Sequence, residues 1–166
     1  MPLLIGLAAL VACTSHDRPA SPAPSAAPTV LEANAVVVRV VDGDTIVATI
    51  AGQETTVRLI GIDTPETVKP NTPVQCWGPE ASAFTKSLLP EGAAVRIERD
   101  AEARDAYDRL LGYVYRAADG TFVNLAIVAG GYARVLTIAP NTAHKAEFVR
   151  AATEAEAAGL GLWSAC

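Results

Sequence analysis

Two short acidic segments of the sequence could together bind a hard metal ion. Asp42-Gly43-Asp44-Thr45 lies between two runs of β-branched residues, and Asp63-Thr64-Pro65-Glu66 follows a third run. In an antiparallel meander, the turn after the first strand and the exit of the third strand lie on the same rim. This arrangement makes Asp44 and Asp63 neighbours, and two adjacent carboxylates repel each other unless a cation lies between them.

Calcium is the cation that best suits such a site. It accepts an irregular set of oxygen ligands, here Asp44, Asp63 and a backbone carbonyl such as that of Thr64, whereas magnesium demands stricter geometry. Each segment also has a simpler interpretation, because Asp-Gly is a common hairpin turn and the second segment could be a plain loop. The prediction therefore rests on the two aspartates together. An EF-hand is excluded, because Ile46 and Val47 occupy positions where that loop needs an oxygen ligand and a glycine.

Two arginines could act on a phosphate group. Arg58 is surrounded by apolar residues in the third β-branched run, so its guanidinium group needs a partner. A core carboxylate could satisfy it structurally. Alternatively, a bend in the strand, for which Gly61 is the candidate, would bring it to the same site as Asp63. Arg109 lies in a polar loop, and its spacing alone does not place it near Asp63.

The elements that would position these residues follow from hydrophobic patterning and turn residues. The patterns predict strands at 36–41, 45–50, 55–62, 93–98 and 110–116. They also predict a helix between Pro79 and Pro90, a short helix over 124–129 and a longer one over 142–158. This set predicts a mainly β, α+β fold, a five-stranded OB-type barrel with about three packed helices.

Composition limits the protein to one compact domain. The chain has 166 residues, of which 51% are hydrophobic, and we expect the domain to span residues 34–166. The formal net charge of -5 argues against a protein that coats nucleic acid tightly and without specificity. An enzyme, however, needs positive charge only at the scissile phosphate.

The N-terminal residues have the features of an export signal. Residues 1–13 form an apolar run too short for the ~20 residues that span a bilayer, and Leu10-Val11-Ala12-Cys13 resembles a bacterial lipobox. An ordinary signal peptide with an incidental cysteine is the alternative. Residues 14–33 are rich in Pro, Ala and Ser and predict an extended linker. We expect an exported protein, either a lipoprotein on the outer face of the cell membrane, lipidated at Cys13, or a secreted one.

Cysteine usage agrees with export. If Cys13 carries lipid, Cys76 and Cys166 remain as one possible disulfide pair, in a compartment where such a bond persists. No two cysteines have zinc-ligand spacing, and neither a Ser-His-Asp nor a Cys-His-Asn set is apparent. Zinc-thiolate and triad chemistry are therefore not expected.

Several motifs in the same order resemble the staphylococcal nuclease, or thermonuclease, family. The resemblance extends over about residues 35–165, and ordered motifs over a whole domain are more specific than any one of them. The matching residues are Asp42-Gly43-Asp44-Thr45, Arg58, Asp63-Thr64-Pro65-Glu66, Gly78-Pro79-Glu80-Ala81-Ser82, Tyr107 with Arg109, and Leu162-Trp163-Ser164.

The resemblance implies a calcium-dependent phosphodiesterase that acts on DNA and RNA, cuts the P–O5′ bond and leaves 3′-phosphates. Guanidinium groups and a divalent ion would stabilise the charge that develops on the phosphate, and a carboxylate would orient or deprotonate the attacking water. By this resemblance the calcium ligands are Asp44, Asp63 and the Thr64 carbonyl, the catalytic residues are Arg58, Glu66 and Arg109, and Tyr107 contacts the phosphate.

Two features depart from the family pattern. The archetype has tyrosines that stack on a nucleotide base where this chain has Thr137, Ile138 and Ala139. Base stacking, worth ~1 to 3 kcal/mol per base, is therefore lost or supplied elsewhere. In the loop after Glu66, Lys69 alone provides a cation to attract substrate, which predicts weaker attraction than in a basic relative.

A different class of function is a non-catalytic OB-type module that binds nucleic acid or protein on a surface lipoprotein. Degenerate domains of this kind usually lack part of the catalytic set, and here the whole set is present, which favours an enzyme. A lipoprotein with a purely structural surface role would leave the charged residues unexplained. We expect a monomer that touches the membrane only through a lipid anchor.

Overall fold

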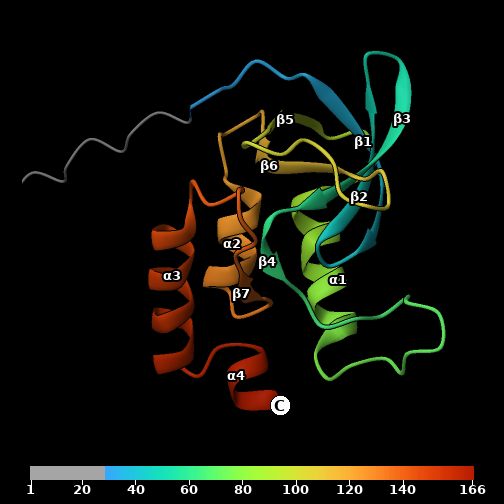
Figure 1. The fold of residues 1–166 in the computed structure, drawn as a ribbon. Coiled ribbons are helices and arrows are strands. Elements are labelled where there is room, and N and C mark those ends of the chain that lie inside the picture. Colours follow the sequence, from blue (N-terminus) through green and yellow to red (C-terminus); the bar gives the residue numbers. More distant parts are fainter. Residues whose placement is uncertain (1–28) are drawn as a thin grey trace, which may run out of the picture.

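A computed structural model describes residues 29–166, so the expected signal peptide, the expected lipidation site at Cys13 and most of the expected linker lie outside the described residues. Five strands close into a barrel, with α-helices against its outside (Figure 1). In spatial order the barrel strands are β1 (Ala35–Asp42), β2 (Thr45–Ile50), β3 (Gln53–Leu59), β6 (Leu110–Arg116) and β5 (Ala94–Glu98).

The barrel has one parallel seam. β1, β2 and β3 form the predicted antiparallel meander, and β5 pairs antiparallel with both β6 and β1. β3 and β6 run parallel, with Arg58 opposite Leu111. The α+β fold with an OB-type five-stranded barrel is thus confirmed.

The third predicted strand, 55–62, is wrong in one respect, because the chain breaks after β3. Gly61 has a φ of 83°, which favours glycine, and a Cβ atom there would overlap the Phe148 ring. Beyond the break, β4 (Gly61–Asp63) leaves the barrel and pairs with β7 (Arg134–Leu136) in a separate two-stranded sheet. The break turns Asp63 toward the barrel rim.

The hairpin turn between β1 and β2 is held by two other segments. Gly43 has no side chain, and a Cβ atom there would lie 2.6 Å from the Thr64 hydroxyl oxygen. The glycine therefore lets the segment after β4 pack directly on the turn. From the other side, the Thr85 hydroxyl donates a hydrogen bond of 2.6 Å to the Gly43 carbonyl.

Residues 29–166 form three helices and one short helical turn: α1 (Gly78–Leu88), α2 (Val123–Ala129), α3 (Lys145–Ala157) and α4 (Leu162–Ala165). α1 and α2 contact barrel strands, whereas α3 packs mainly on α2 and on the β4–β7 sheet (Figure 1). The predicted third helix began at Thr142, three residues too early. The residues before α3 make tertiary hydrogen bonds instead, since the Ala143 N–H donates to Asp100 and the Asn141 side chain bonds the backbone of Glu102.

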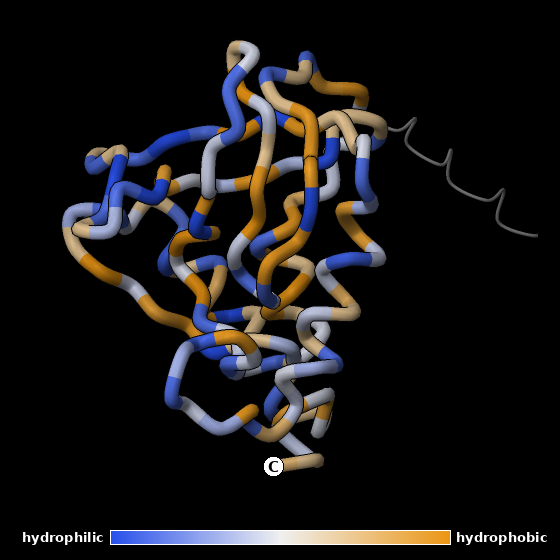
Figure 2. Tube along the Cα trace, turned by 90° about the vertical axis from the view of Figure 1, so that its right-hand side faces the viewer, coloured by the Kyte–Doolittle hydropathy of each residue, from blue (hydrophilic) through white to orange (hydrophobic). Residues whose placement is uncertain are grey.

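The hydrophobic core fills the barrel and continues under the helices. Hydrophobic stretches run along the barrel strands (Figure 2), and Ile46, Val57 and Leu59 are fully buried. Asn124 of α2 is also buried, and its amide donates to the Ile60 carbonyl at the strand break. Within residues 29–166, no helix is both long enough and apolar enough to cross a membrane.

Candidate active site

All eight residues predicted for substrate, metal or catalysis line one cavity of about 540 Å³ at the barrel rim. They come from the β1–β2 turn, from β3, from β4 and the segment after it, and from the loop before β6. The buried Asp42, which was not predicted as a site residue, lines the cavity too. The eight residues are Asp44, Arg58, Asp63, Thr64, Glu66, Lys69, Tyr107 and Arg109.

Arg58 joins the two aspartates. Its Nη1 lies 2.7 Å from Oδ2 of Asp44, and its Nη2 donates a 2.9 Å hydrogen bond to Oδ1 of Asp63. Nη1 also donates to the Leu59 carbonyl at 3.1 Å. The Arg58 side chain is 14% exposed, and these contacts fix its guanidinium group at the cavity wall.

Thr64 contacts Asp44 through two donors. Its backbone N–H and its hydroxyl both donate to Oδ2 of Asp44, at 2.8 Å and 3.0 Å. The Thr45 hydroxyl donates to the other oxygen of the same carboxylate. These bonds fix the orientation of Asp44, while the role of the Thr64 carbonyl as a metal ligand stays a prediction.

The electrostatics of the cavity fit a hard divalent cation. Burial raises the pKa of Asp63; Arg58 opposes this rise, and the charges of Asp44 and Glu66 add to it. Burial also raises the pKa of Asp42. Oxygen atoms are the only metal-ligand type among the eight residues, and calcium prefers oxygen. Within residues 29–166 no three Asp, Glu, His or Cys side chains form a metal cluster.

Arg109 is held by Asp105, which was not predicted as a site residue. The backbone N–H and the Nε of Arg109 donate to the two Asp105 carboxylate oxygens, at 2.9 Å and 2.6 Å. Burial opposes ionisation of Asp105, but the hydrogen bonds from Arg109 and from the Tyr107 N–H outweigh it and lower its pKa. Among the described residues none accepts a hydrogen bond from the Nη atoms of Arg109, which remain available to a ligand.

The parallel pairing of β3 with β6 brings the second arginine to the first. Val57 lies opposite Leu110, so Arg109 enters the seam beside the strand that carries Arg58. The Tyr107 ring lies next to Arg109, with 5.5 Å between the ring centroid and the guanidinium carbon, and is 83% exposed. Both arginines and this tyrosine therefore face the same open space.

Glu66 lies at the start of the loop between β4 and α1. Its Oε1 accepts hydrogen bonds from the backbone N–H groups of Thr67, Val68 and Lys69, at 2.9 to 3.0 Å. Burial opposes ionisation, but hydrogen bonds, from the side chain of Asp42 and from these N–H groups, outweigh it and lower the pKa of Glu66. Glu66 is thus ionised at neutral pH.

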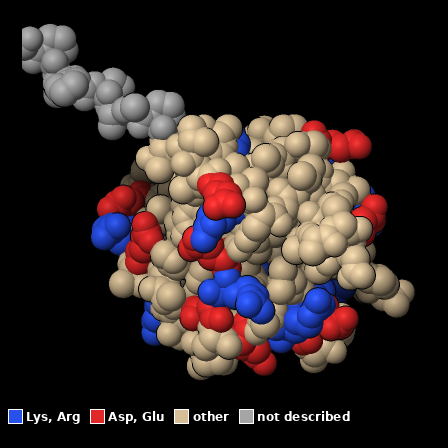
Figure 3. All heavy atoms as spheres, turned by 90° about the horizontal axis from the view of Figure 1, so that it is seen from above, with Lys and Arg blue, Asp and Glu red and all other residues tan. Residues whose placement is uncertain are grey.

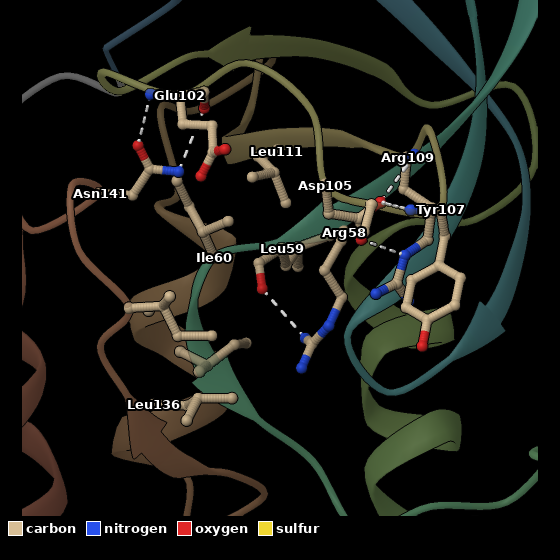
Figure 4. Close-up of a pocket in the computed structure, with 14 residues that line it drawn as sticks. Arg58, Leu59, Ile60, Glu102, Asp105, Tyr107, Arg109, Leu111, Leu136 and Asn141 are labelled. Atoms are coloured by element: carbon tan, nitrogen blue, oxygen red, sulfur yellow. Dashed lines mark hydrogen bonds and ion pairs between the residues drawn. The ribbon is translucent and has the colours of Figure 1, made fainter.

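A second cavity, of about 310 Å³, adjoins the first and shares Arg58, Tyr107 and Arg109 with it. Figure 4 shows aliphatic side chains, including Ile60 and Leu136, on one side of this cavity and the two arginines with Tyr107 on the other. Leu136 and the exposed Ile138 also line it, close to the stretch where the tyrosines of the archetype are missing. An apolar recess beside paired guanidinium groups fits a phosphate that carries a planar or sugar substituent.

Outside the site acidic groups outnumber basic ones, in line with the formal net charge of -5. The face seen in Figure 3 shows basic groups beside acidic ones, without a continuous basic track. Ion pairs such as Arg39 with Glu54 and Arg104 with Asp108 account for this. The attraction of a polyanion therefore depends on the site itself.

A disulfide joins Cys76 to Cys166, and both residues are exposed. It lies outside the cavity, between the end of the loop that begins at Glu66 and the residue after α4. The cysteine count, with Cys13 set aside for lipid, predicts this pair, and the two Cα atoms are 6.0 Å apart.

Comparison with known proteins shows consistent similarities. The model of the family described as staphylococcal nuclease homologue matches residues 56–165. A thermonuclease from Staphylococcus intermedius is 46% identical over 128 residues, which cover 77% of this chain and 74% of that protein. A thermonuclease from Staphylococcus hyicus is 41% identical with the same coverage. The SPbeta prophage-derived endonuclease YokF of Bacillus subtilis (strain 168) is 44% identical over 128 residues, 76% of this chain and 42% of the relative.

Proposed function

The chain belongs to the staphylococcal nuclease family and is a nuclease, and from this premise we propose that it hydrolyses DNA and RNA with calcium, cutting the P–O5′ bond and leaving 3′-phosphates. The observation that carries the proposal is that Arg58 and Arg109 line one cavity with Asp44 and Asp63. The alternative of a non-catalytic binding module lacks support, because the similar proteins are themselves named as nucleases.

The two arginines are proposed to stabilise the phosphate as water attacks it. A phosphodiester under attack gains negative charge on its equatorial oxygens, and oriented guanidinium groups are effective donors to such charge. Asp105 fixes Arg109 through Nε, which leaves both Nη atoms for phosphate oxygens. Arg58 is oriented by Asp44, Asp63 and the Leu59 carbonyl.

Glu66 is proposed to orient the attacking water and to accept its proton. A carboxylate can do this only when ionised, and the lowered pKa of Glu66 keeps it so at neutral pH. The three backbone N–H groups engage Oε1, so the second carboxylate oxygen is the one proposed to meet the water.

Asp44, Asp63 and the Thr64 carbonyl are proposed to hold the calcium ion. When bound, the ion supplies positive charge that polarises the phosphate and lowers the pKa of water. The two carboxylates would then be shared between the ion and Arg58, which already contacts both. Crowding of negative charge around Asp63 supports the assignment.

Substrate binding is proposed to use both cavities. Tyr107 and Lys69 line the charged one and would contact phosphate groups, while the adjoining aliphatic recess would take a nucleoside. Leu136 and Ile138 offer apolar contact there but no aromatic face, so affinity should be lower than in a relative that stacks tyrosines on the base.

An assay of the purified protein on end-labelled single-stranded DNA and RNA tests this function. Cleavage should require calcium, stop on addition of a chelator, and yield fragments that a phosphatase converts to 3′-hydroxyl ends. Full cleavage in the presence of chelator would show that the reaction does not require calcium. Fragments carrying 5′-phosphates instead would show that the other P–O bond is cut.

We further propose that the protein acts outside the cytoplasm, as a lipoprotein or in secreted form. The exposed Cys76–Cys166 disulfide supports this, because such bonds persist in oxidising compartments. Mass spectrometry of the mature protein from the producing cells tests the anchor. A lipid on an N-terminal Cys13 is expected, and unlipidated protein found solely in the medium would contradict the lipoprotein proposal.

A further inference from the structure

Glu66 and Gln75 are joined by two reciprocal hydrogen bonds. The Glu66 N–H donates to the side-chain Oε1 of Gln75, and the Gln75 N–H donates to the Glu66 carbonyl, each at 2.9 Å. The two residues close the loop between them, which projects from the body of the molecule (Figure 1). The backbone of Glu66 therefore depends on Gln75 for its position.

The Thr67 hydroxyl donates a 2.7 Å hydrogen bond to Asp42, but beyond Thr67 the loop has little support of its own. Val68 and Val74 are 56% and 59% exposed, so the loop buries little apolar surface on the barrel. Segments with few buried contacts open locally at low free energy unless other contacts hold them. The position of the Glu66 carboxylate thus depends on the two ends of the loop.

At its far end the loop is fastened to the rest of the protein. The Gln75 carbonyl accepts the N–H of Gly78, where α1 begins, and a Cβ atom on Gly78 would lie 3.1 Å from the Glu66 carbonyl oxygen. The next residue after Gln75 is Cys76, which is covalently bound to Cys166.

The partner cysteine is itself fixed to the body. The Cys166 N–H donates to the Leu162 carbonyl, and the Leu162 N–H donates to the Gly131 carbonyl just after α2. A chain of bonds thus runs from the body of the protein through the disulfide to Gln75 and on to Glu66. Both cysteines are exposed, so a soluble reductant can reach the disulfide in the folded protein.

We propose that Gln75 is a positioning residue for Glu66, that the Cys76–Cys166 disulfide holds Gln75 in place, and that reducing this disulfide lowers the nuclease activity. The proposal rests on the proposed role of Glu66. Reduction by a dithiol transfers two electrons and two protons to the protein, yields the Cys76 and Cys166 thiols, and oxidises the dithiol to its own disulfide.

The first test replaces the Gln75 amide. Gln75→Met keeps the side-chain length but removes the acceptor, so kcat should fall roughly 10-fold while KM stays within about twofold, since misplacement of a catalytic group affects the chemical step. Gln75→Glu restores an acceptor oxygen and should recover most of kcat. Gln53→Met, the same change at an exposed position of β3, is the matched control and should leave kcat unchanged.

A double-mutant cycle separates this inference from the proposed function. Glu66→Gln alone should lower kcat strongly. Adding Gln75→Met to that variant should lower kcat by less than about a further twofold. If Glu66→Gln retains wild-type kcat, the proposed role of Glu66 fails. If Glu66→Gln loses activity but Gln75→Met does not, or if the two losses multiply in full, only the positioning role is overturned.

The second test concerns the disulfide. Treatment of the full chain with a dithiol and, separately, the double substitution Cys76→Ser with Cys166→Ser should each lower kcat at unchanged KM, with the fold checked by circular dichroism at the assay temperature. The dithiol should not affect the double variant. Wild-type kcat in either folded, disulfide-free form would overturn the role of the disulfide. Full loss of structure would also overturn it, because the bond would then stabilise the whole fold and would have no separate effect on the position of Glu66.

Discussion

The Asp105 carboxylate holds the Arg109 guanidinium group through Nε, with 2.6 Å between Nε and Oδ2. Its other oxygen accepts the backbone N–H of Arg109, so side chain and backbone are fixed together. Bidentate contact of this kind limits rotation of the arginine and leaves its terminal nitrogens pointing at the cavity that Arg58 shares.

Arg109→Ala should lower kcat about 10²- to 10³-fold, as expected for loss of one oriented donor to developing charge. The measurement is the steady-state rate of cleavage of single-stranded DNA with saturating calcium. Arg150→Ala on the exposed face of α3 is the matched control and should change kcat by less than about twofold. Equal rates for the two variants would contradict the placement of Arg109 in the site.

Asp105→Ala should lower kcat about 10-fold, less than loss of the arginine itself, because a misoriented guanidinium group retains its charge. In the Arg109→Ala background the same change should have almost no further effect, since Asp105 acts through Arg109. A rate assay of the two single variants and the double variant decides this. Multiplicative losses would show that Asp105 has a separate role.

Asp63→Asn should weaken calcium binding roughly 10-fold or more, because the number of charged oxygen ligands tunes calcium affinity. Isothermal titration calorimetry of the variant against the wild type measures this without an activity readout. Glu91→Gln is the control, because Glu91 is an exposed carboxylate that follows the C-terminal end of α1. Unchanged affinity in Asp63→Asn would place the ion elsewhere.

Removal of the disulfide should also reduce global stability. The bond spans 90 residues of sequence, and a cross-link of this kind restricts the unfolded chain. A loss of about 2 to 4 kcal/mol in the free energy of unfolding is expected for the Cys76→Ser, Cys166→Ser double variant. Urea titration of the oxidised wild type and the variant gives the difference, and identical midpoints would contradict it.

Asp100 should make the fold sensitive to acid. The N–H of Ala143 lowers the pKa of Asp100 below its usual 3.8; burial opposes this, and the Tyr113 hydroxyl adds to the lowering. The unfolded chain therefore takes up the proton more readily, so the stabilisation is complete above about pH 4 and is lost as the pH falls through the lowered value. Between about pH 5 and pH 2, the melting temperature of Asp100→Asn should fall less than that of the wild type. A slope equal to that of the wild type would assign the acid sensitivity to other groups.

Most of the barrel could be predicted from sequence because its strands are local β-branched runs with clear turns. The segment 110–116 matches β6, and the hairpin at Asp42–Asp44 follows from the Asp-Gly turn. Gly61 is the sequence signal for the break after Leu59, but Ile60 and Ile62 continue the same apolar pattern, so the pattern predicts a strand that runs on to Ile62. β7 has only three residues, and its pairing with β4 exists through tertiary contact alone.

The same division applies to the site. The neighbourhood of Asp44 and Asp63 follows from the antiparallel connection, which sequence reveals. The position of Arg109 depends on the register between β3 and β6, which are separated by a long stretch of chain. Asp105 had a weak signal, an acidic residue four positions before an arginine, whereas Gln75 had none, because its partner is the backbone of Glu66.

The parallel seam between β3 and β6 has a consequence for when the enzyme becomes active during folding. Each arginine belongs to a different sheet segment until that seam forms, since the connection between the two strands runs through α1 and β5. In a chain whose barrel is still open, Arg58 and Arg109 lie at opposite edges of the unclosed sheet and cannot bind the same phosphate. A chain in which this seam has not formed is therefore expected to lack cleavage activity, because its two arginines do not yet line one cavity.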